Sequence, residues 1–325
     1  MRFRSYNRKP RVRITVIATA VSFSAVTAAL LLVPRGTPAQ VPAPTSPNLA
    51  VAPGAISSDA IPTAAMPPAA IASVPIPAGT SARSTARGPI LNGPHSRPNF
   101  VLRVPILMYH RVIDPALEGR SAPQLVVPPA LFAAQMTTLR RAGWRTIDTA
   151  TLAADVAMGR RPPPRTFVIS FDDGYADGYT EAFPILRRLH FVATYFIVTG
   201  RLGWSDQLTV ADVKALDAGG MEIGDHTVDH VDLNSLSDPR LHDEVFDSRL
   251  SILRTVSEPP VSFAYPFGVG DAAVASVVES AGFEMAVTNR EGVRETWANR
   301  FHVPRLRVGP GTGPADLLQQ MARYA

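Results

Sequence analysis

Two short segments of the sequence carry residue types suited to hydrolytic metal chemistry. Asp172 and Asp173 follow an apolar run and precede Gly174, and His226 and His230 stand four residues apart further along the chain. One carboxylate and two imidazoles can occupy three positions around a divalent cation, while the second carboxylate stays free to act as a base. The pattern therefore predicts a hydrolase in which a bound cation and a carboxylate together activate water.

Each segment follows a stretch typical of a buried β-strand. Phe167 to Phe171 is an apolar run, and 221–224 is a shorter one that ends in glycine. The carboxyl ends of parallel strands are where barrels and open α/β folds place their chemistry. We expect the two histidines to face one side of a helical turn. Because threonine follows His226, this is not the His-Glu-x-x-His motif of zinc proteases, and Asp172 is left as the candidate base.

Taken alone, each segment has a simpler interpretation. An Asp-Asp-Gly sequence also fits a plain turn between a strand and a helix, and two histidines four residues apart are often surface residues. Their succession at two strand ends favours the metal site.

Apolar runs of strand length alternate with helical patterns from about residue 100 onward. The runs lie at Val104–Tyr109, Thr166–Phe171, Ala193–Val198, Met221–Ile223, Val261–Tyr265, Glu284–Val287 and Leu306–Val308. Helical spacing of apolar residues occurs around 132–143, 183–189, 210–216, 245–253 and 274–278. Such alternation implies a mostly parallel sheet, and some seven strands in 99–325 favour a closed or nearly closed barrel over a small open sheet.

The head of the chain has the composition of a membrane anchor or signal peptide. A basic flank, 1–13, precedes the segment 14–34, which is uncharged and rich in Ala, Val, Leu and Ile from Ile14 to Val33. As a helix this stretch would reach about 30 Å, enough to span a bilayer with the basic flank in the cytoplasm. We expect a membrane-anchored protein with an extracytoplasmic domain. Cleavage near 37–39, which would release a secreted form, is the alternative.

A spacer is expected to separate this head from the domain at 99–325. Residues 35–98 are rich in proline and alanine and contain one acidic residue, Asp59. Such a segment cannot bury enough apolar surface to offset its ordering entropy, so we expect a disordered, semi-rigid linker. A linker of this kind would let the domain reach an extended substrate such as a cell wall or matrix.

Charge and cysteine content exclude several classes of function. Residues 1–98 hold ten of the 32 Lys and Arg and one of the 27 Asp and Glu, which leaves about −4 for 99–325. The domain therefore has no basic surface of the kind that binds nucleic acid. Cysteine is absent, so disulfides and thiolate ligands are excluded and any metal must be held by imidazole and oxygen.

The two motifs in this order resemble those of the polysaccharide deacetylase family, the NodB-homology domains of carbohydrate esterase family 4. Phe171 to Gly174 matches the first motif and His226 to His230 the second, and the resemblance spans about 100–310. It implies a distorted (β/α)7-type barrel with a divalent cation on Asp173, His226 and His230, and Asp172 as the base. Zinc is favoured, with cobalt, nickel or iron as alternatives. Asp225 or Asp229 could orient a ligand imidazole.

The third family motif is altered in this chain. It reads Ala264-Tyr265-Pro266-Phe267-Gly268, so alanine stands where the family has the arginine that orients the base. The resemblance implies that the backbone N–H of Phe267 faces the oxyanion of the reaction. It also places Tyr265 in the cleft, and we expect Tyr175 to join it in binding substrate. Without the arginine, either another group orients Asp172 or the base is tuned differently.

The final family motif, Leu-x-His, is also missing. The strand that contains Leu306 has no histidine at the corresponding place, which leaves His110 and His302 as candidate proton donors. His110 ends the first apolar run and forms a Tyr-His pair with Tyr109. That pair resembles the subgroup acting on exported poly-N-acetylglucosamine. We therefore favour His110 as the general acid.

The function expected from the resemblance is metal-dependent removal of N-acetyl groups from an N-acetylglucosamine-containing polysaccharide. Exported poly-N-acetylglucosamine, peptidoglycan and a chitin-like glycan are the candidate substrates. An O-acetyl esterase acting on a polysaccharide, an inactive glycan-binding module and an anchored scaffold without activity are the alternatives. Retention of Asp172 argues against a pure binding module, which needs no base.

Overall fold

The computed structural model describes residues 99–118 and 122–325, all of which fall within one compact unit. The predicted head, 1–34, and the linker, 35–98, lie outside the described residues. Within the described ranges, no helix is both long enough and apolar enough to cross a membrane.

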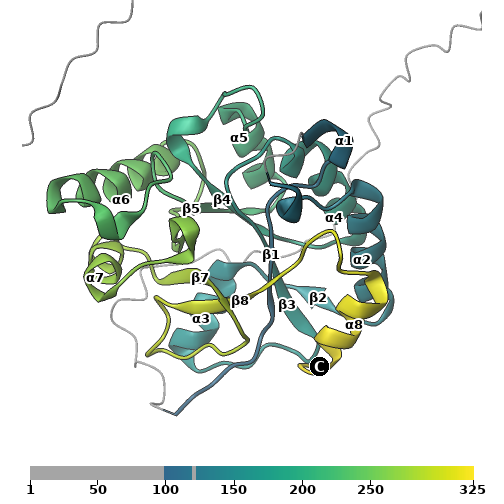
Figure 1. Cartoon of the computed structure of the whole chain (residues 1–325). Helices are drawn as coiled ribbons and strands as arrows, with labels where there is room; N and C mark the ends of the chain where they lie inside the picture. The colour runs from purple at the N-terminus through teal and green to yellow at the C-terminus, as the bar shows by residue number, and fades with distance from the viewer. Residues whose placement is uncertain (1–98, 119–121) are drawn as a thin grey trace, which may run out of the picture. The chain divides into compact units, whose positions relative to one another are not determined.

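Seven parallel strands close into a barrel (Figure 1). They are β1 (Ile106–Tyr109), β3 (Thr166–Phe171), β4 (Thr194–Ile197), β5 (Glu222–Asp225), β6 (Ser262–Ala264), β7 (Met285–Glu291) and β8 (Val303–Arg307). Closure comes from β1, which pairs with β3 on one side and with β8 on the other. The two-residue β2 (Arg145–Thr146) pairs only with the start of β3 and stays outside the ring. The prediction of a closed or nearly closed barrel is confirmed.

Helices surround the barrel (Figure 1). They are α1 (Pro115–Glu118), α2 (Pro129–Arg141), α3 (Thr149–Met158), α4 (Phe183–Leu189), α5 (Val210–Ala218), α6 (Asp238–Leu253), α7 (Ala272–Ser280) and α8 (Pro314–Ala322). The sequence pattern missed α1, α3 and α8. For α3 the cause is its environment: nearly every residue from Thr149 to Ala157 is buried, so no polar face marks a helical period.

Apolar side chains inside the ring fill the barrel. They come from the strands and from one helix: Ile106, Val168, Phe196, Met285 and Val303 pack with Leu152 and Val156 of α3. Gly224 on β5 is required by this packing, because a Cβ atom there would lie 2.5 Å from the ring of Phe196. The filled interior leaves the strand ends as the place for a site.

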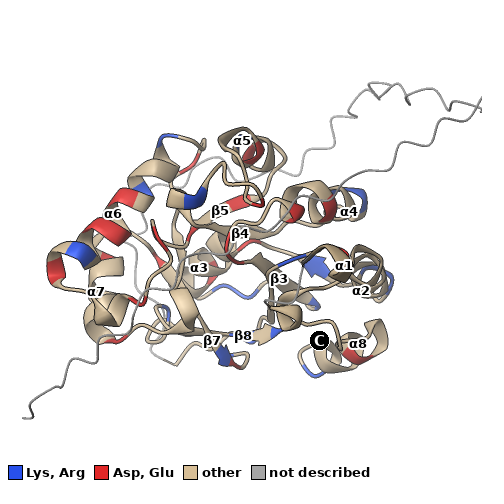
Figure 2. Ribbon diagram, turned by 45° about the horizontal axis from the view of Figure 1, so that its top comes forward, with Lys and Arg blue, Asp and Glu red and all other residues tan. Residues whose placement is uncertain are grey.

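Two further clusters fix the outer helices to the strands. One includes Phe132 of α2, Leu186 of α4 and Leu317 of α8. The other joins Val245 of α6 and Val278 of α7 to Phe263 of β6. Figure 2 shows basic and acidic residues interspersed along α6, whose apolar side faces the barrel. These five helices thus each bury an apolar face against the barrel.

Candidate active site

Asp173, His226 and His230 converge at the carboxyl ends of two strands. Asp173 follows β3 and the histidines follow β5. Asp173 Oδ1 lies 3.4 Å from His226 Nε2 and 3.2 Å from His230 Nε2. The three candidate ligand atoms all lie within 4.8 Å of one another. Two imidazole nitrogens and one carboxylate oxygen fit a divalent transition metal with an open position for water or substrate.

The ring of His226 is oriented by a backbone carbonyl. Its Nδ1 lies 2.6 Å from the carbonyl oxygen of Ala264. A carbonyl can only accept, so Nδ1 carries the proton and Nε2 presents its lone pair to the site. The expected orienting carboxylates serve elsewhere: Asp225 accepts from the Thr227 amide and the Ser248 hydroxyl, and Asp229 pairs with Arg240.

Charge within this cluster favours an ionised ligand carboxylate. Burial alone would raise the pKa of Asp173, but its hydrogen bonds to His226 and His230 hold that pKa well below its usual range. Burial acts to lower the pKa of His226, but the hydrogen bond to Asp173 and the negative charges of Asp172 and Asp173 together outweigh it, and the pKa is raised. Asp173 is therefore an ionised carboxylate at neutral pH and can bind a cation.

The segment 226–230 is an irregular loop, which corrects the expected helical turn. Thr227 and His230 have left-handed backbone angles, with φ of 71° and 58°. The Thr227 amide donates to Asp225 Oδ1 at 2.8 Å, and the His230 amide donates to Thr227 Oγ1 at 3.0 Å. The histidines therefore meet through a tight turn fixed by side-chain acceptors instead of helical spacing.

A buried glutamate on α6 holds the tip of this loop. Glu244 Oε2 accepts from the amides of Val228 and Asp229 at 3.1 and 2.9 Å. Its other oxygen accepts from Arg240 at 3.1 Å. The register of α6 against the barrel thus determines where His230 lies.

Strained backbone gathers at the site. Six non-glycine residues in the described ranges have positive φ, and Asp173, Thr227, His230 and Phe267 are four of them. A β-branched residue such as Thr227 rarely adopts this conformation, so the surrounding hydrogen bonds must impose it. Such clustering is typical of functional sites.

Asp172 is held by Arg305 of β8, a residue to which the sequence analysis assigned no role. Nη1 and Nη2 of Arg305 donate to Oδ1 and Oδ2 of Asp172 at 2.7 and 2.6 Å. The remaining N–H groups donate to Ser170 Oγ, Asn289 Oδ1 and the Thr288 carbonyl. All five donors of this fully buried guanidinium are thereby used.

Arg305 also determines the charge of Asp172. Burial would raise the pKa of this carboxyl, but the guanidinium holds it below its usual value. Asp172 is therefore a carboxylate near neutral pH. A signal for Arg305 did exist in the sequence: it stands between Val303 and Leu306 in a strand pattern, and an arginine at such a buried position needs a carboxylate as partner.

His110 lies beside Asp172, whereas His302 is engaged elsewhere. His110 Nε2 is 4.0 Å from Asp172 Oδ2, and 11% of the His110 side chain is exposed. Burial lowers the pKa of His110, and the nearby carboxylates of Asp172 and Asp173 oppose that shift. His302 Nε2 lies 2.9 Å from the carbonyl of Gly270, and its ring stacks on Tyr265.

The aromatic residues of the altered third motif lie in different environments. Tyr265 is 1% exposed, and its hydroxyl donates to the Phe301 carbonyl at 3.0 Å. It offers no surface to a substrate, contrary to the expectation that it lines the cleft. Phe267 is exposed, and its ring centroid lies 4.9 Å from that of His230. Tyr175 is half-buried. The guanidinium carbon of Arg111 lies 4.3 Å from the centroid of the Tyr175 ring.

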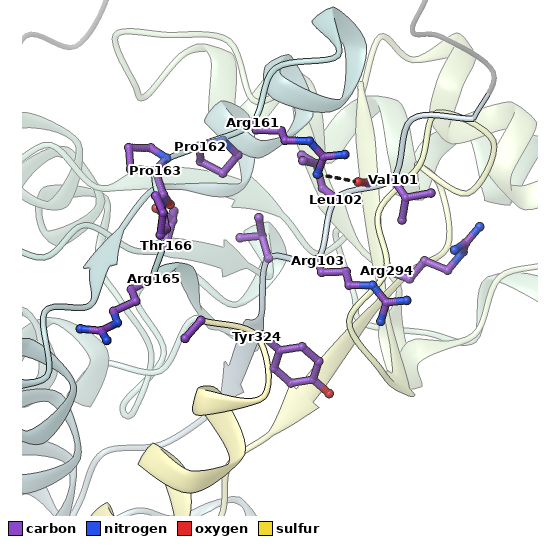
Figure 3. A pocket seen from close by; sticks show the side chains of 13 residues that line it. Val101, Leu102, Arg103, Arg161, Pro162, Pro163, Arg165, Thr166, Arg294 and Tyr324 are labelled. Atoms are coloured by element: carbon purple, nitrogen blue, oxygen red, sulfur yellow. Dashed lines mark hydrogen bonds between the residues drawn. The ribbon is translucent and has the colours of Figure 1, made fainter.

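A hollow of about 510 Å³ lies at the other end of the barrel (Figure 3). It is lined by the segment 101–104 before β1 and by the first residue of β3. Four of its lining residues are arginines: Arg103, which lies in that segment, and Arg161, Arg165 and Arg294. None of the candidate ligands or Asp172 is part of it. The chemistry is therefore placed at the carboxyl ends of the strands and not in this hollow.

Comparison with known proteins agrees with this geometry. Residues 159–286 match the family model described as polysaccharide deacetylase. The chain is 29% identical over 209 residues to a putative polysaccharide deacetylase, YxkH, of Bacillus subtilis, covering 64% of this chain and 72% of that protein. It is 24% identical over 160 residues to a poly-beta-1,6-N-acetyl-D-glucosamine N-deacetylase of Staphylococcus aureus, covering 45% of this chain and 55% of that protein.

A solved structure shares the fold of the described domain. The Streptococcus pyogenes deacetylase PplD, solved in complex with acetate, superposes with a TM-score of 0.63 at 28% identity, covering 68% of this chain and 98% of that one. Motifs, barrel and comparisons agree that the chain contains a polysaccharide deacetylase domain.

Proposed function

We propose that the domain removes N-acetyl groups from an N-acetylglucosamine-containing polysaccharide by metal-assisted hydrolysis. The observation that carries this proposal is the carboxylate of Asp172, which is ionised and fixed by Arg305 next to the Asp173, His226 and His230 cluster. A protein that only binds glycan has no use for such a base. Exported poly-N-acetylglucosamine is the favoured substrate, on the likeness to the Staphylococcus aureus enzyme.

Asp173, His226 and His230 would hold the cation. A divalent metal in this place supplies Lewis acidity, which polarises an acetyl carbonyl and makes water more acidic. Zinc suits the two imidazoles and one carboxylate.

Asp172 acts as the general base in this proposal. Attack by water on the acetamide carbon requires the loss of one water proton, and Asp172 accepts it. Arg305 donates to both carboxylate oxygens, so the base keeps one orientation before the substrate arrives.

His110 supplies the proton that the departing nitrogen needs. Breaking the C–N bond releases acetate and an amine, and the amine leaves readily only when it is protonated. His110 Nε2 lies 4.0 Å from Asp172 Oδ2, which places the imidazole at the same strand ends as the base. The amide N–H of Phe267, on its left-handed turn, is proposed to stabilise the oxyanion.

Product analysis tests the proposal. The full-length protein is stripped with a chelator, reloaded with one divalent ion at a time, and incubated with β-1,6-linked poly-N-acetylglucosamine, peptidoglycan or chitin oligomers. We expect acetate and free amine in equal amounts, only with metal present. Acetate with free hydroxyl from acetylated xylan alone would indicate an O-acetyl esterase, and no acetate from any glycan would indicate a binding module.

The location of the domain is a second part of the proposal. The basic flank 1–13 and the apolar segment 14–34 support an anchored protein with an extracytoplasmic domain. Externally added protease should then release the domain from intact cells. A soluble mature protein that begins near residue 40 would instead show a cleaved signal peptide.

A further inference from the structure

Two exposed aromatic side chains flank the loop that carries the histidine ligands. Trp204 and Phe267 are 62% and 60% exposed, and every other described Phe, Trp or Tyr is at least half-buried. Trp204 lies between β4 and α5, and Phe267 follows β6. Because β4 and β6 are the two neighbours of β5, the loops that carry these rings follow the strands on either side of β5, and His226 comes directly after β5.

The loop that carries Trp204, residues 199–209, is fixed to the histidine loop along its first turn. The Thr199 amide donates to the Thr227 carbonyl at 3.0 Å, and the Gly200 amide donates to the Val228 carbonyl at 2.9 Å. The approach is so close that a Cβ atom on Gly200 would lie 2.6 Å from that second carbonyl oxygen. Trp204 thus has a defined position relative to the ligand loop.

The same loop is fixed to the aspartate turn at its other end. The Leu208 amide donates to the Gly174 carbonyl at 2.9 Å, and the Ala176 amide donates to the Asp206 carbonyl at 3.0 Å. Within the loop, the Gln207 amide donates to the Trp204 carbonyl at 3.1 Å. With both ends held, the indole remains exposed on an ordered backbone, and binding a ligand there costs little ordering entropy.

An exposed indole in this position suits a sugar ring. A pyranose presents an apolar C–H face, and stacking that face on an indole removes apolar area from water on both partners. The neighbouring carboxylates of Asp206 and Asp229 pair with Arg111 and Arg240 and are each 53% exposed, so their outward oxygens can also accept hydrogen bonds from sugar hydroxyls.

We propose that Trp204 is a glycan-binding residue whose indole stacks on a pyranose unit next to the unit that is being deacetylated. The inference rests on the proposed function, because it identifies the substrate as a polymer that extends beyond the reacting sugar along the loops after β4, β5 and β6. It assigns to Trp204 a role in affinity for long substrates and none in bond breaking.

The kinetic test compares substrates of different length in the full-length, metal-loaded protein. Trp204→Ala should raise KM about tenfold for a pentamer of β-linked N-acetylglucosamine and leave kcat unchanged. The same variant should not affect an aryl acetate or a monosaccharide. Trp204→Phe should restore most of the affinity, and Met158→Ala, which truncates an exposed apolar side chain on α3, should behave as wild type. An unchanged KM for the pentamer, or an equal loss on every substrate, would overturn the proposal.

A binding measurement separates this inference from the proposed activity. The chain has three tryptophans, of which Trp144 is buried. Added pentamer should shift the tryptophan emission of the Asp172→Asn protein, and the Trp204→Ala, Asp172→Asn double variant should lose that shift and bind the pentamer more weakly by calorimetry. Glycan binding that depends on Trp204 in a protein without deacetylase activity would support the site and refute the activity. Deacetylation by the wild-type protein, with no emission shift in the Asp172→Asn protein, would support the activity and refute the Trp204 site.

Discussion

The guanidinium of Arg305 donates to both carboxylate oxygens of Asp172, at 2.7 and 2.6 Å, across 133 residues of sequence. The family motif that usually supplies such an arginine carries Ala264 here, and the Ala264 carbonyl accepts from His226 instead. The base-orienting group is thus present, but it comes from β8 and not from the turn after β6. The proposed chemistry can proceed with the altered third motif for this reason.

Replacing Arg305 should impair both stability and turnover. Arg305→Ala leaves a buried carboxylate without its partner and should lower the free energy of unfolding by about 3–5 kcal/mol. Arg305→Lys keeps one charge but loses the paired geometry, so we expect a folded protein with kcat reduced roughly tenfold or more. Urea denaturation and steady-state kinetics measure the two effects.

Added guanidinium ion provides the control for this role. It should restore part of the activity of Arg305→Ala and none of the activity of Asp172→Asn. Metal content should remain normal in Arg305→Lys. An Arg305→Lys protein with wild-type kcat would show that Asp172 needs no bidentate partner.

The two adjacent aspartates should differ in their effects. Asp172→Asn should keep its metal, because the candidate ligands are untouched, and should lose about 10²-fold or more in kcat with the general base. Asp173→Asn should weaken metal binding as well, because it removes a ligand oxygen. Metal analysis after dialysis, together with kinetics, separates the two; equal loss of metal in both variants would refute the division of roles.

His110 should matter more for amides than for activated esters. An amine is a poor leaving group without protonation, whereas an aryl oxide leaves readily. His110→Ala should therefore reduce deacetylation of N-acetyl sugars strongly and hydrolysis of an aryl acetate much less. His302→Ala is the matched control and should have little effect, because that ring contacts Gly270 and Tyr265. The opposite ranking would assign proton donation to His302.

Glu295 should make stability depend on pH. It is fully buried, with Oε2 accepting from the Val104 amide at 2.9 Å and Oε1 lacking a hydrogen-bond partner among the described residues. Burial raises its pKa from 4.5 to about 8. Between these values the folded state keeps a proton that the unfolded state has released, so stability falls as pH rises.

The Glu295→Gln variant should lose this contribution. A difference of one bound proton between the folded and unfolded states changes the free energy of unfolding by about 1.4 kcal/mol per pH unit. Between pH 5 and 8, the free energy of unfolding should therefore fall less steeply with pH in the variant than in the wild type, by up to that amount. Urea denaturation across this range tests the effect. Glu258→Gln, on the exposed surface, should retain the wild-type slope. Parallel curves for Glu295→Gln and wild type would show that Glu295 is not the titrating group.

Much of the site could be predicted from sequence because its parts are local. Asp172 and Asp173 directly follow the apolar strand β3, and the two histidines follow β5. In a parallel barrel the carboxyl ends of all strands meet on one face, so residues at those ends must approach one another. The cluster of Asp173, His226 and His230, and the position of His110 beside Asp172, agree with that expectation.

The sequence by itself determined the barrel and the chemical character of its catalytic face, because strand periodicity and strand ends are encoded within a few residues. Only the tertiary structure decided which groups orient the site. Arg305 reaches Asp172 because β8 pairs with β1 and β1 pairs with β3, and the left-handed turn at Thr227 depends on acceptors from Asp225 and α6. Closure of the sheet sets the contact between Arg305 and Asp172, and no local pattern encodes a contact between strands more than a hundred residues apart.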